Sequence, residues 1–210
     1  MNQYHKIQTV FKRDPNSNYK TLLEGDFSLP EFEYLQNNEW EWEEKIDGTN
    51  LRLMFNGEQI IFGGKTDRAQ LPAPLVAKLN RTILPQLDLF KSTFKDGGAC
   101  LYCEGYGPGI QKGGKYRQDQ DIALFDVKIG EWWLQRQDVV GIGSIFGIDC
   151  APVIGHGTLD DMVEVVREGF KSTWGDFIAE GIVARPALEL KSRNGSRIIT
   201  KLKYKDFVTK

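Results

Sequence analysis

Three signals that would classify a chain at once are missing from this sequence of 210 residues: a long apolar run, an excess of one charge and an even set of cysteines. No stretch approaches the roughly 20 apolar residues of a membrane helix. No apolar leader follows Met1, so we expect neither a membrane partner nor a secretory signal. The net charge of −2 excludes a uniformly basic surface, so any nucleic-acid contact must come from local patches. Three cysteines cannot all pair, which favours a reducing compartment.

The cysteines do not match a zinc site well either. Cys100 and Cys103 form a C-x-x-C pair, which Cys150 and His156 could in principle complete. Residues 99–104 have the composition of a buried strand, however, and strand residues three positions apart point to opposite faces. Because the chain has no second C-x-x-C, the sequence favours a structural role for these thiols.

Glycine-rich phosphate loops are also absent. The segment GGKT at residues 63–66 resembles the end of a Walker motif, but the first glycine of that motif would fall on Gln59. The segment GYGPG at residues 105–109 has Ile110 where a dinucleotide fingerprint needs its third glycine. Both segments are therefore predicted to be turns.

The pattern that is present predicts an α+β fold in one compact domain over residues 1–210. An apolar content of 40% with five tryptophans can fill a core of that size. Strands are predicted at 40–46, 51–55, 59–62, 99–105, 121–128, 131–134, 181–185 and 197–203, and helices at 72–92, 135–146 and 158–170. Because the helices stand between hairpins rather than after every strand, we expect antiparallel sheets with flanking helices.

An alternation of tryptophan and glutamate runs into the segment EKIDGTN at residues 44–50. The period of two puts Trp40, Trp42 and Ile46 on one face of a strand. The other face then carries Lys45 among carboxylates at the strand end, where Gly48 permits a tight turn. A strand of this kind can pack on a core while it presents a lysine for chemistry.

The segment EKIDGTN resembles motif I, K-x-D/H-G-x-N, of the covalent nucleotidyltransferases, which include RNA ligases, DNA ligases and mRNA capping enzymes. Four further segments resemble the later motifs in the family's order: YCEGYGPGIQKGGKY (motif III), ALFDV (IIIa), EGIVAR (IV) and IITKLKYK (V). Together they span residues 44–203. The resemblance implies a nucleotidyltransferase (ATP-grasp-like ligase) core of antiparallel sheets with flanking helices.

The resemblance also implies a role for each matching residue. Lys45 would attack the α-phosphorus of ATP and form a lysyl-AMP, with Lys201 and Lys203 gripping that phosphate. Glu180 would bind Mg²⁺ (or Mn²⁺) or its waters. The implied nucleotide contacts are Glu44 and the Ile46 backbone at the adenine edge, Asn50, Glu104 at the ribose, Phe125 stacked on adenine, and Lys65, for which Arg68 is the alternative.

Asn50 favours the RNA ligases, because DNA ligases and capping enzymes tend to carry arginine at that position. Only seven residues follow Lys203, so we expect no C-terminal OB domain. The loop at 106–120, with Lys112, Lys115 and Arg117, is the expected RNA contact.

The sequence thus predicts a monomeric, cytoplasmic ATP-dependent RNA ligase, located in the host cytoplasm if the protein is viral. It would join RNA 5′-phosphate and 3′-hydroxyl ends through lysyl-AMP and an adenylylated 5′ end. Two alternatives stay open at this point. One is a minimal ATP-dependent DNA ligase, and the other is a nucleotide- or RNA-binding module without turnover.

Overall fold

The computed structural model describes residues 3–95 and 97–208, which form two compact units. Unit 1 comprises the N-terminal segment that ends at His5 and the segment Asp47–Ala151. Unit 2 comprises Lys6–Ile46 and the chain from Pro152 onward. A single adenylyltransferase domain over residues 1–210 stays a prediction, because two compact units can belong to one catalytic domain.

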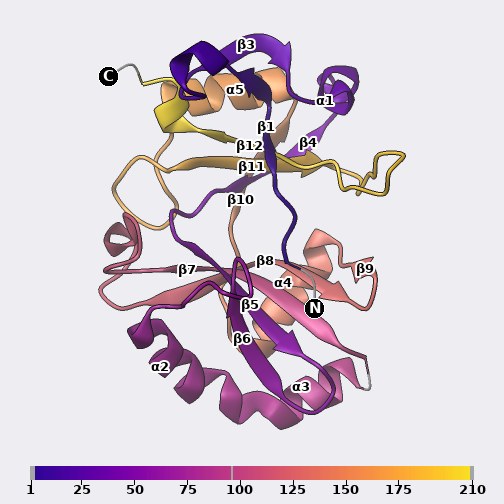
Figure 1. The fold of residues 1–210 in the computed structure, drawn as a ribbon, viewed down its shortest axis with the longest axis vertical. Coiled ribbons are helices and arrows are strands. Elements are labelled where there is room, and N and C mark those ends of the chain that lie inside the picture. Colours follow the sequence, from indigo (N-terminus) through magenta and orange to yellow (C-terminus); the bar gives the residue numbers. More distant parts are fainter. Residues whose placement is uncertain (1–2, 96, 209–210) are drawn as a thin grey trace. The chain divides into compact units, whose positions relative to one another are not determined.

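Unit 1 is built on a five-stranded antiparallel sheet (Figure 1). Its strands, in spatial order, are β6 (Ile60–Gly64), β5 (Thr49–Phe55), β7 (Ala99–Tyr106), β8 (Asp121–Ile129) and β9 (Trp132–Trp133). The predicted Asn56-Gly57 hairpin joins β5 to β6, with Gly57 in the left-handed region at φ 98°. The asparagine side chain accepts from the backbone of the two residues that follow Gly57, which fixes the turn.

Helices cover one face of this sheet. They are α2 (Ala73–Thr82), α3 (Leu87–Phe94) and α4 (Arg136–Phe146), and their apolar side chains share one core with β5, β7 and β8. The prediction of one continuous helix over 72–92 is wrong. The short 3₁₀ segment η2 (Leu84–Gln86) interrupts it, because Pro85 has no N–H to donate and disfavours helical geometry in the residue before it.

Unit 2 is built on a second five-stranded sheet. Its strands, in spatial order, are β1 (Gln8–Thr9), β12 (Thr200–Lys203), β11 (Gly181–Pro186), β4 (Trp40–Glu44) and β10 (Val153–Gly157). All neighbours are antiparallel except the β1–β12 pair. The hairpin of β2 (Phe11–Arg13) and β3 (Leu22–Phe27) and the helices α1 (Pro30–Leu35) and α5 (Leu159–Glu168) complete the unit.

The two faces of β4 differ as the alternation predicted. Trp40 and Trp42 are buried in the core of unit 2, together with side chains of α1 and α5. Glu43 lies outside that core and pairs with Arg185 of β11 at 3.0 Å. The sequence therefore placed the apolar face of β4 correctly, and with it the face on which charged groups gather.

The predicted α+β class with antiparallel sheets and flanking helices is confirmed. Several short strands were not predicted, among them β1, β2 and the glycine-containing β10, because two- or three-residue strands and glycine give little period-two signal. Among the described residues, no helix has the length and apolar character needed to cross a membrane.

Candidate active site

Three neighbouring strands of unit 2 bring Lys45, Glu180 and Lys203 together. Lys45 follows β4, Glu180 precedes β11 and Lys203 ends β12. Gly181 pairs with Lys203 in the β11–β12 ladder, and its carbonyl accepts from the Lys45 backbone N–H at 2.9 Å. The register thus aligns residues that lie up to 158 positions apart in the sequence, counting from 45 to 203.

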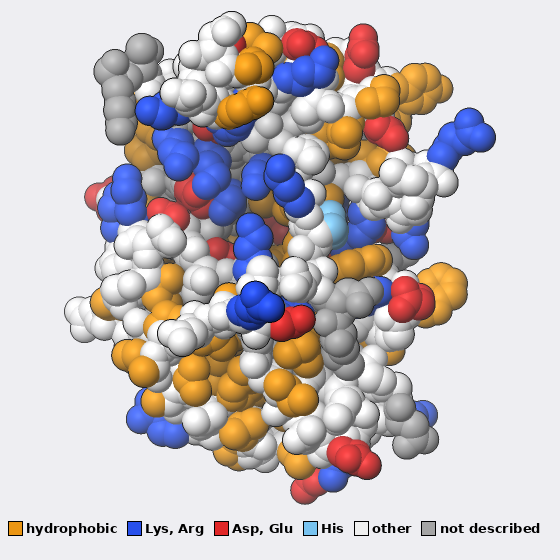
Figure 2. Space-filling view, in the orientation of Figure 1, with side chains coloured by type: hydrophobic (Ala, Val, Ile, Leu, Met, Phe, Trp, Pro, Cys, Tyr) orange, Lys and Arg blue, Asp and Glu red, His pale blue; other side chains and the backbone are white. Residues whose placement is uncertain are grey.

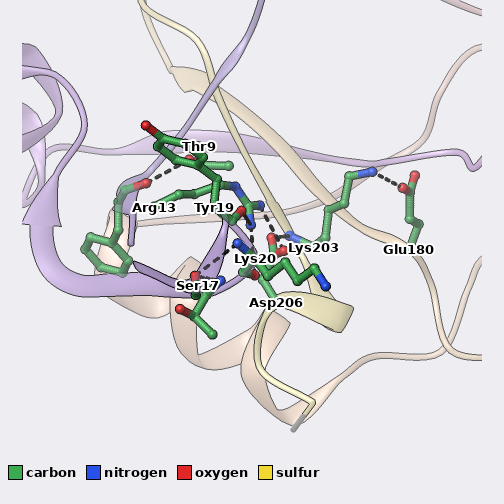
Figure 3. A network of polar contacts seen from close by, with 10 residues as sticks. Thr9, Arg13, Ser17, Tyr19, Lys20, Glu180, Lys203 and Asp206 are labelled. Atoms are coloured by element: carbon green, nitrogen blue, oxygen red, sulfur yellow. Dashed lines mark hydrogen bonds and ion pairs between the residues drawn. The ribbon is translucent and has the colours of Figure 1, made fainter. Parts of the chain in front are cut away.

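The Glu180 carboxylate binds both lysines. The Lys45 Nζ donates to Oε2 at 2.7 Å, and the Lys203 Nζ donates to Oε1 at 2.6 Å. Figure 3 shows the second of these contacts. The Lys45 Nζ also donates to the carbonyl of Ile46 at 3.3 Å, while the Ile46 side chain is buried. The backbone oxygen of Ile46, and not its side chain, is therefore the part that can take part in polar contacts here.

The environment of Glu180 lowers its pKa. Burial alone would raise the pKa of this carboxyl group, but the charges and hydrogen bonds of Lys45 and Lys203 outweigh burial and hold it below its ordinary value. Glu180 is therefore ionised at neutral pH.

Gly181 allows the close approach of β11 to β12 at this point. Its φ is 154°, and a Cβ atom there would lie 2.0 Å from the Leu202 carbonyl oxygen. Any larger residue would push the two strands apart and separate Glu180 from Lys203. The close approach of the two strands thus explains why glycine follows the carboxylate in the EGIVAR segment.

Lys201 shares the face of β12 with Lys203. It lies opposite Val183 of β11, which in turn lies opposite Glu43 of β4. Both lysines are half-buried, so their aliphatic parts are held by the sheet. The predicted pairing of the two cations on one face agrees with this register.

Glu44 is buried, and its carboxylate is held by a loop far away in the sequence. It accepts from the Ser172 hydroxyl, from the Thr173 N–H at 2.8 Å and from the Thr173 hydroxyl at 2.7 Å. An adenine contact through this side chain would have to share oxygens that already accept three hydrogen bonds. Ser172 and Thr173 were missed by the sequence reasoning, because no local pattern marks a contact over 128 positions.

Unit 1 brings Asn50 and Glu104 together. They lie opposite each other in the β5–β7 ladder. Gly48 permits close packing beside them, because a Cβ atom there would lie 2.2 Å from the Gly105 carbonyl oxygen. The side-chain oxygen of Asn50 is buried and has no hydrogen-bond partner within residues 3–95 and 97–208. A buried acceptor without a donor is costly, so this position fits a ligand that donates a hydrogen bond.

Arg52 fixes the turn that carries Lys65. This arginine is fully buried, and it donates to the Gly64 carbonyl at 2.9 Å and to Asp67 at 2.7 Å. The hydrogen bond and charge of Arg52 lower the pKa of Asp67. Lys65 and its alternative Arg68 are both exposed in this turn. The sequence analysis gave Arg52 no role. Its position between Leu51 and Leu53 in a predicted strand was nevertheless a signal for a charge with a specific partner.

Phe125 lies at a bulge in β8. Tyr102 of β7 pairs with Asp126 and Cys103 pairs with Leu124, so Phe125 is the extra residue between them. Its ring is half-buried and meets the Tyr4 ring edge-on, with 5.1 Å between centroids. Unlike Leu124, Phe125 is not part of the helix-covered core, so the bulge turns an aromatic ring away from it.

The three basic residues of the 106–120 loop differ in their environments. Arg117 is tied to Asp119 at 2.6 Å and to Asp121 at 2.5 Å. Burial would lower the pKa of Arg117, but the hydrogen bonds with Tyr106 and Asp119 and the charge of Asp121 raise it above the ordinary value. Lys112 is exposed and makes no ion pair with any described residue. Two carboxylates of the same unit therefore hold Arg117, whereas Lys112 has no such contact, and RNA binding by these residues stays a prediction.

The residues fit a nucleotide better than they fit a metal held by protein alone. No group of three or more His, Cys, Asp or Glu side chains in the described ranges could hold a metal ion. Glu180 is a single carboxylate, which suits Mg²⁺ or Mn²⁺ only where water and substrate phosphates supply the other ligands. Within unit 2, the lysines beside Glu180 provide donors of the kind that the phosphates of a nucleotide accept.

Replacing Glu180 with glutamine should remove a pH-dependent part of the stability. A carboxyl group with a lowered pKa stabilises the fold fully above its unfolded-state pKa, which is ordinarily 4.5. That stabilisation is lost as the pH falls through the lowered pKa of the folded state. The free energy of unfolding, measured with denaturant between pH 7 and pH 3, should therefore fall less steeply toward acid pH (a flatter acid limb) in Glu180→Gln than in the wild type. Glu33→Gln, at an exposed position of α1, is the control and should follow the wild-type curve. An acid limb unchanged in Glu180→Gln would contradict the assigned ion pairs.

Comparison with known proteins identifies the family. The family model described as RNA ligase matches residues 38–203. This range contains every predicted site residue, from Glu44 to Lys203.

Solved structures of an RNA ligase from Naegleria gruberi share the fold. A variant solved with ATP and Mn has a TM-score of 0.67 at 16% identity, covering 97% of this chain and 56% of that one. Another variant with ATP and Mn has a TM-score of 0.65 at 15% identity, covering 98% and 60%. A variant solved in the apo state has a TM-score of 0.65 at 13% identity, covering 99% and 58%. The present chain thus spans less than two thirds of the length of these proteins.

Proposed function

This chain belongs to the RNA ligase family, and from that premise we propose that it is an ATP-dependent ligase that joins RNA 5′-phosphate and 3′-hydroxyl ends through a lysyl-AMP. The observation that carries the proposal is the Lys45–Glu180–Lys203 cluster, in which one carboxylate holds two ammonium groups at three adjoining strand ends. Such a cluster suits phosphoryl transfer because it offers a nucleophile and a cation for the charge that develops on a phosphate.

In the first step, Lys45 acts as the nucleophile. Its ammonium donates to Glu180, and in that state it has no free electron pair. The amine must leave the carboxylate and lose a proton before it attacks the α-phosphorus of ATP. The Nζ–P bond then forms as the bond from that phosphorus to the β-phosphate oxygen breaks, and pyrophosphate leaves. Lys203 and Lys201, which share one face of β12, would neutralise charge on the phosphate oxygens.

Two further transfers use the RNA ends. An oxygen of the RNA 5′-phosphate attacks the phosphorus of the lysyl-AMP, which breaks the Nζ–P bond and leaves an adenylylated 5′ end. The 3′-hydroxyl of the second end then attacks the 5′-phosphate, and AMP leaves as the phosphodiester forms. Lys45 returns as a free amine, so the chain is ready for another ATP.

A divalent cation, Mg²⁺ or Mn²⁺, would supply charge neutralisation at the ATP phosphates. Glu180 is the residue that would hold it, directly or through water. Both of its oxygens accept from lysines in this structure, so a cation bound there would share the carboxylate with the two ammonium groups or displace one of them.

The test is incubation of the protein with α-labelled ATP and Mg²⁺, followed by denaturing electrophoresis. Label that stays on the protein indicates the covalent adduct. Absence of label under Mg²⁺ and Mn²⁺ would refute the proposed first step and would favour a binding module without turnover.

Supplying nucleic acid to the labelled protein separates the two ligase classes. We expect transfer of label to a 5′-phosphorylated RNA end and sealing of a nicked or single-stranded RNA. Sealing of nicked DNA in preference to RNA would favour the alternative of a minimal DNA ligase. Action as a monomer in the cytoplasm, or in the host cytoplasm for a viral protein, is part of the same proposal.

The environments of Arg117 and Lys112 predict opposite effects of mutation. Lys112→Ala should weaken RNA binding about two- to threefold with an unchanged melting temperature, because a single surface phosphate contact contributes little. Arg117→Ala should lower the melting temperature, because Asp119 and Asp121 then lose a cation. Fluorescence anisotropy with labelled RNA and thermal melting measure the two quantities. Weaker RNA binding by folded Arg117→Ala, with Lys112→Ala like wild type, would reverse this assignment.

A further inference from the structure

The turn at residues 14–21, which joins β2 to β3 in unit 2, has an unusual backbone that the proposed chemistry does not use. Asn18 and Tyr19 follow each other in the left-handed region, with φ of 52° and 59°. This conformation is uncommon outside glycine, and for two adjacent residues it persists only where surrounding contacts enforce it. The turn therefore has a defined shape, and the contacts that fix this shape show which of its side chains are left to bind a partner.

Arg13 is one of the residues that hold the turn. Its Nη1 donates to the Lys20 carbonyl at 3.2 Å and to the Tyr19 carbonyl at 3.4 Å. Ser17 adds a second support, because its hydroxyl accepts from the Lys20 N–H at 3.1 Å. These bonds satisfy the carbonyls of Tyr19 and Lys20 and the N–H of Lys20, while the N–H groups of Asn18 and Tyr19 donate to the Pro15 and Asp14 carbonyls.

The same arginine connects the turn to the candidate active site. Its Nη2 donates to Asp206 at 2.9 Å, and the Asp206 side chain is only 3% exposed. The other oxygen of Asp206 accepts from the Lys203 backbone N–H at 3.2 Å, and the Lys203 side chain binds Glu180. Figure 3 shows this series of contacts from the turn to Glu180. The position of the turn is thus coupled to the position of Lys203.

The turn presents an aromatic ring and a cation to solvent. Tyr19 is 63% exposed. Lys20 is exposed, and its ammonium has no ion-pair partner in the ranges that the structure describes. The nearby Asp14 carboxylate accepts from the Asn16 N–H at 2.9 Å, so it caps the turn. In Figure 2, basic side chains gather over the part of unit 2 in which Figure 1 places β12.

We propose that Tyr19 and Lys20 form a contact site for the RNA strand, in which the tyrosine ring stacks on a base and the lysine binds a phosphodiester. An exposed aromatic residue beside an unpaired cation is the combination that single-stranded nucleic acid recognises. Arg13 and Asp206 are positioning residues that hold this site in a fixed relation to Lys203. The inference rests on the proposed function and assigns a substrate contact to a segment outside the five motifs.

The double variant Tyr19→Ala/Lys20→Ala tests the site. Fluorescence anisotropy with a 5′-phosphorylated single-stranded RNA should show binding about tenfold weaker than wild type. The slope of log Kd against log salt concentration should fall by about 0.7, the value for one phosphate contact on a single strand. Adduct formation with α-labelled ATP should stay within about twofold of wild type, because neither side chain contacts Lys45 or Glu180.

Two further variants separate a specific contact from a general surface effect. Tyr34→Ala/Lys171→Ala removes an even more exposed tyrosine and a lysine that pairs with Asp176, both elsewhere in unit 2, and it should bind RNA like wild type. Tyr19→Trp keeps an aromatic ring and should retain the affinity. If Tyr19→Ala/Lys20→Ala binds RNA like wild type, and both it and the wild type form the adduct, the contact site is refuted while the proposed function stands. If the wild-type protein forms no adduct, the proposed function itself fails.

Discussion

Lys45→Ala should abolish the protein–AMP adduct, with a loss of at least about 1,000-fold in labelling rate, since removal of a catalytic nucleophile leaves no alternative path to the covalent intermediate. Lys45→Arg should be equally inactive, because the guanidinium keeps its positive charge at any accessible pH and offers no free electron pair. Electrophoresis after incubation with α-labelled ATP measures both.

Lys12→Ala is a matched control, because Lys12 also pairs with a carboxylate, that of Asp26 at 2.6 Å, and lies outside the cluster. It should label like wild type. A second readout uses RNA that already carries AMP on its 5′ end. Lys45→Ala should seal this substrate, because the last transfer does not use the lysine. An acid-labile adduct in Lys45→Ala would show that the nucleophile lies elsewhere.

The sequence predicted the strands that carry the motifs because their signals are local. Alternation in β4 placed Trp40 and Trp42 in a core and left Lys45 at the strand end with charged neighbours. Motif order then predicted that Glu180 and Lys203 belong to the same site as Lys45. The ladder of β4, β11 and β12 brings the Glu180 carboxylate to 2.7 Å from the Lys45 Nζ and to 2.6 Å from the Lys203 Nζ.

What the sequence did not predict depends on contacts between distant residues. The loop that binds Glu44 contributes Ser172 and Thr173, and no periodicity connects residues 128 positions apart. Arg13 and Asp206 pair over 193 positions for the same reason. The break in the predicted helix at 72–92 is different, because Pro85 was a local signal that the regular spacing of leucines outweighed.

The same distinction explains the basic loop. Composition alone gave Lys112, Lys115 and Arg117 one role, as RNA contacts. The structure gives Arg117 a different environment from Lys112, because Arg117 pairs with Asp119 and Asp121 of its own unit. A charged residue in a sequence counts as a potential contact, whereas a charged residue in a fold counts only if its charge is not already compensated nearby.

Lys203→Met should lower the rate of adduct formation about 100- to 1,000-fold, the usual cost of removing one donor that stabilises charge in a transition state. Methionine keeps the length and apolar stem of lysine, so the half-buried position on β12 stays filled. Only the ammonium that binds Glu180 at 2.6 Å is lost. The variant also leaves the backbone contact from residue 203 to Asp206 in place.

The kinetic parameters decide between a role in the transition state and a role in the resting ion pair. If Lys203 neutralises charge as the pyrophosphate leaves, kcat should fall while KM for ATP changes little. Lys205→Met, two residues further on at an exposed position, is the control and should behave like wild type. An increase in KM with an unchanged kcat would limit Lys203 to ground-state binding. The carboxylate of Glu180 would then remain as the group that orders the site, because it still binds the Lys45 ammonium at 2.7 Å.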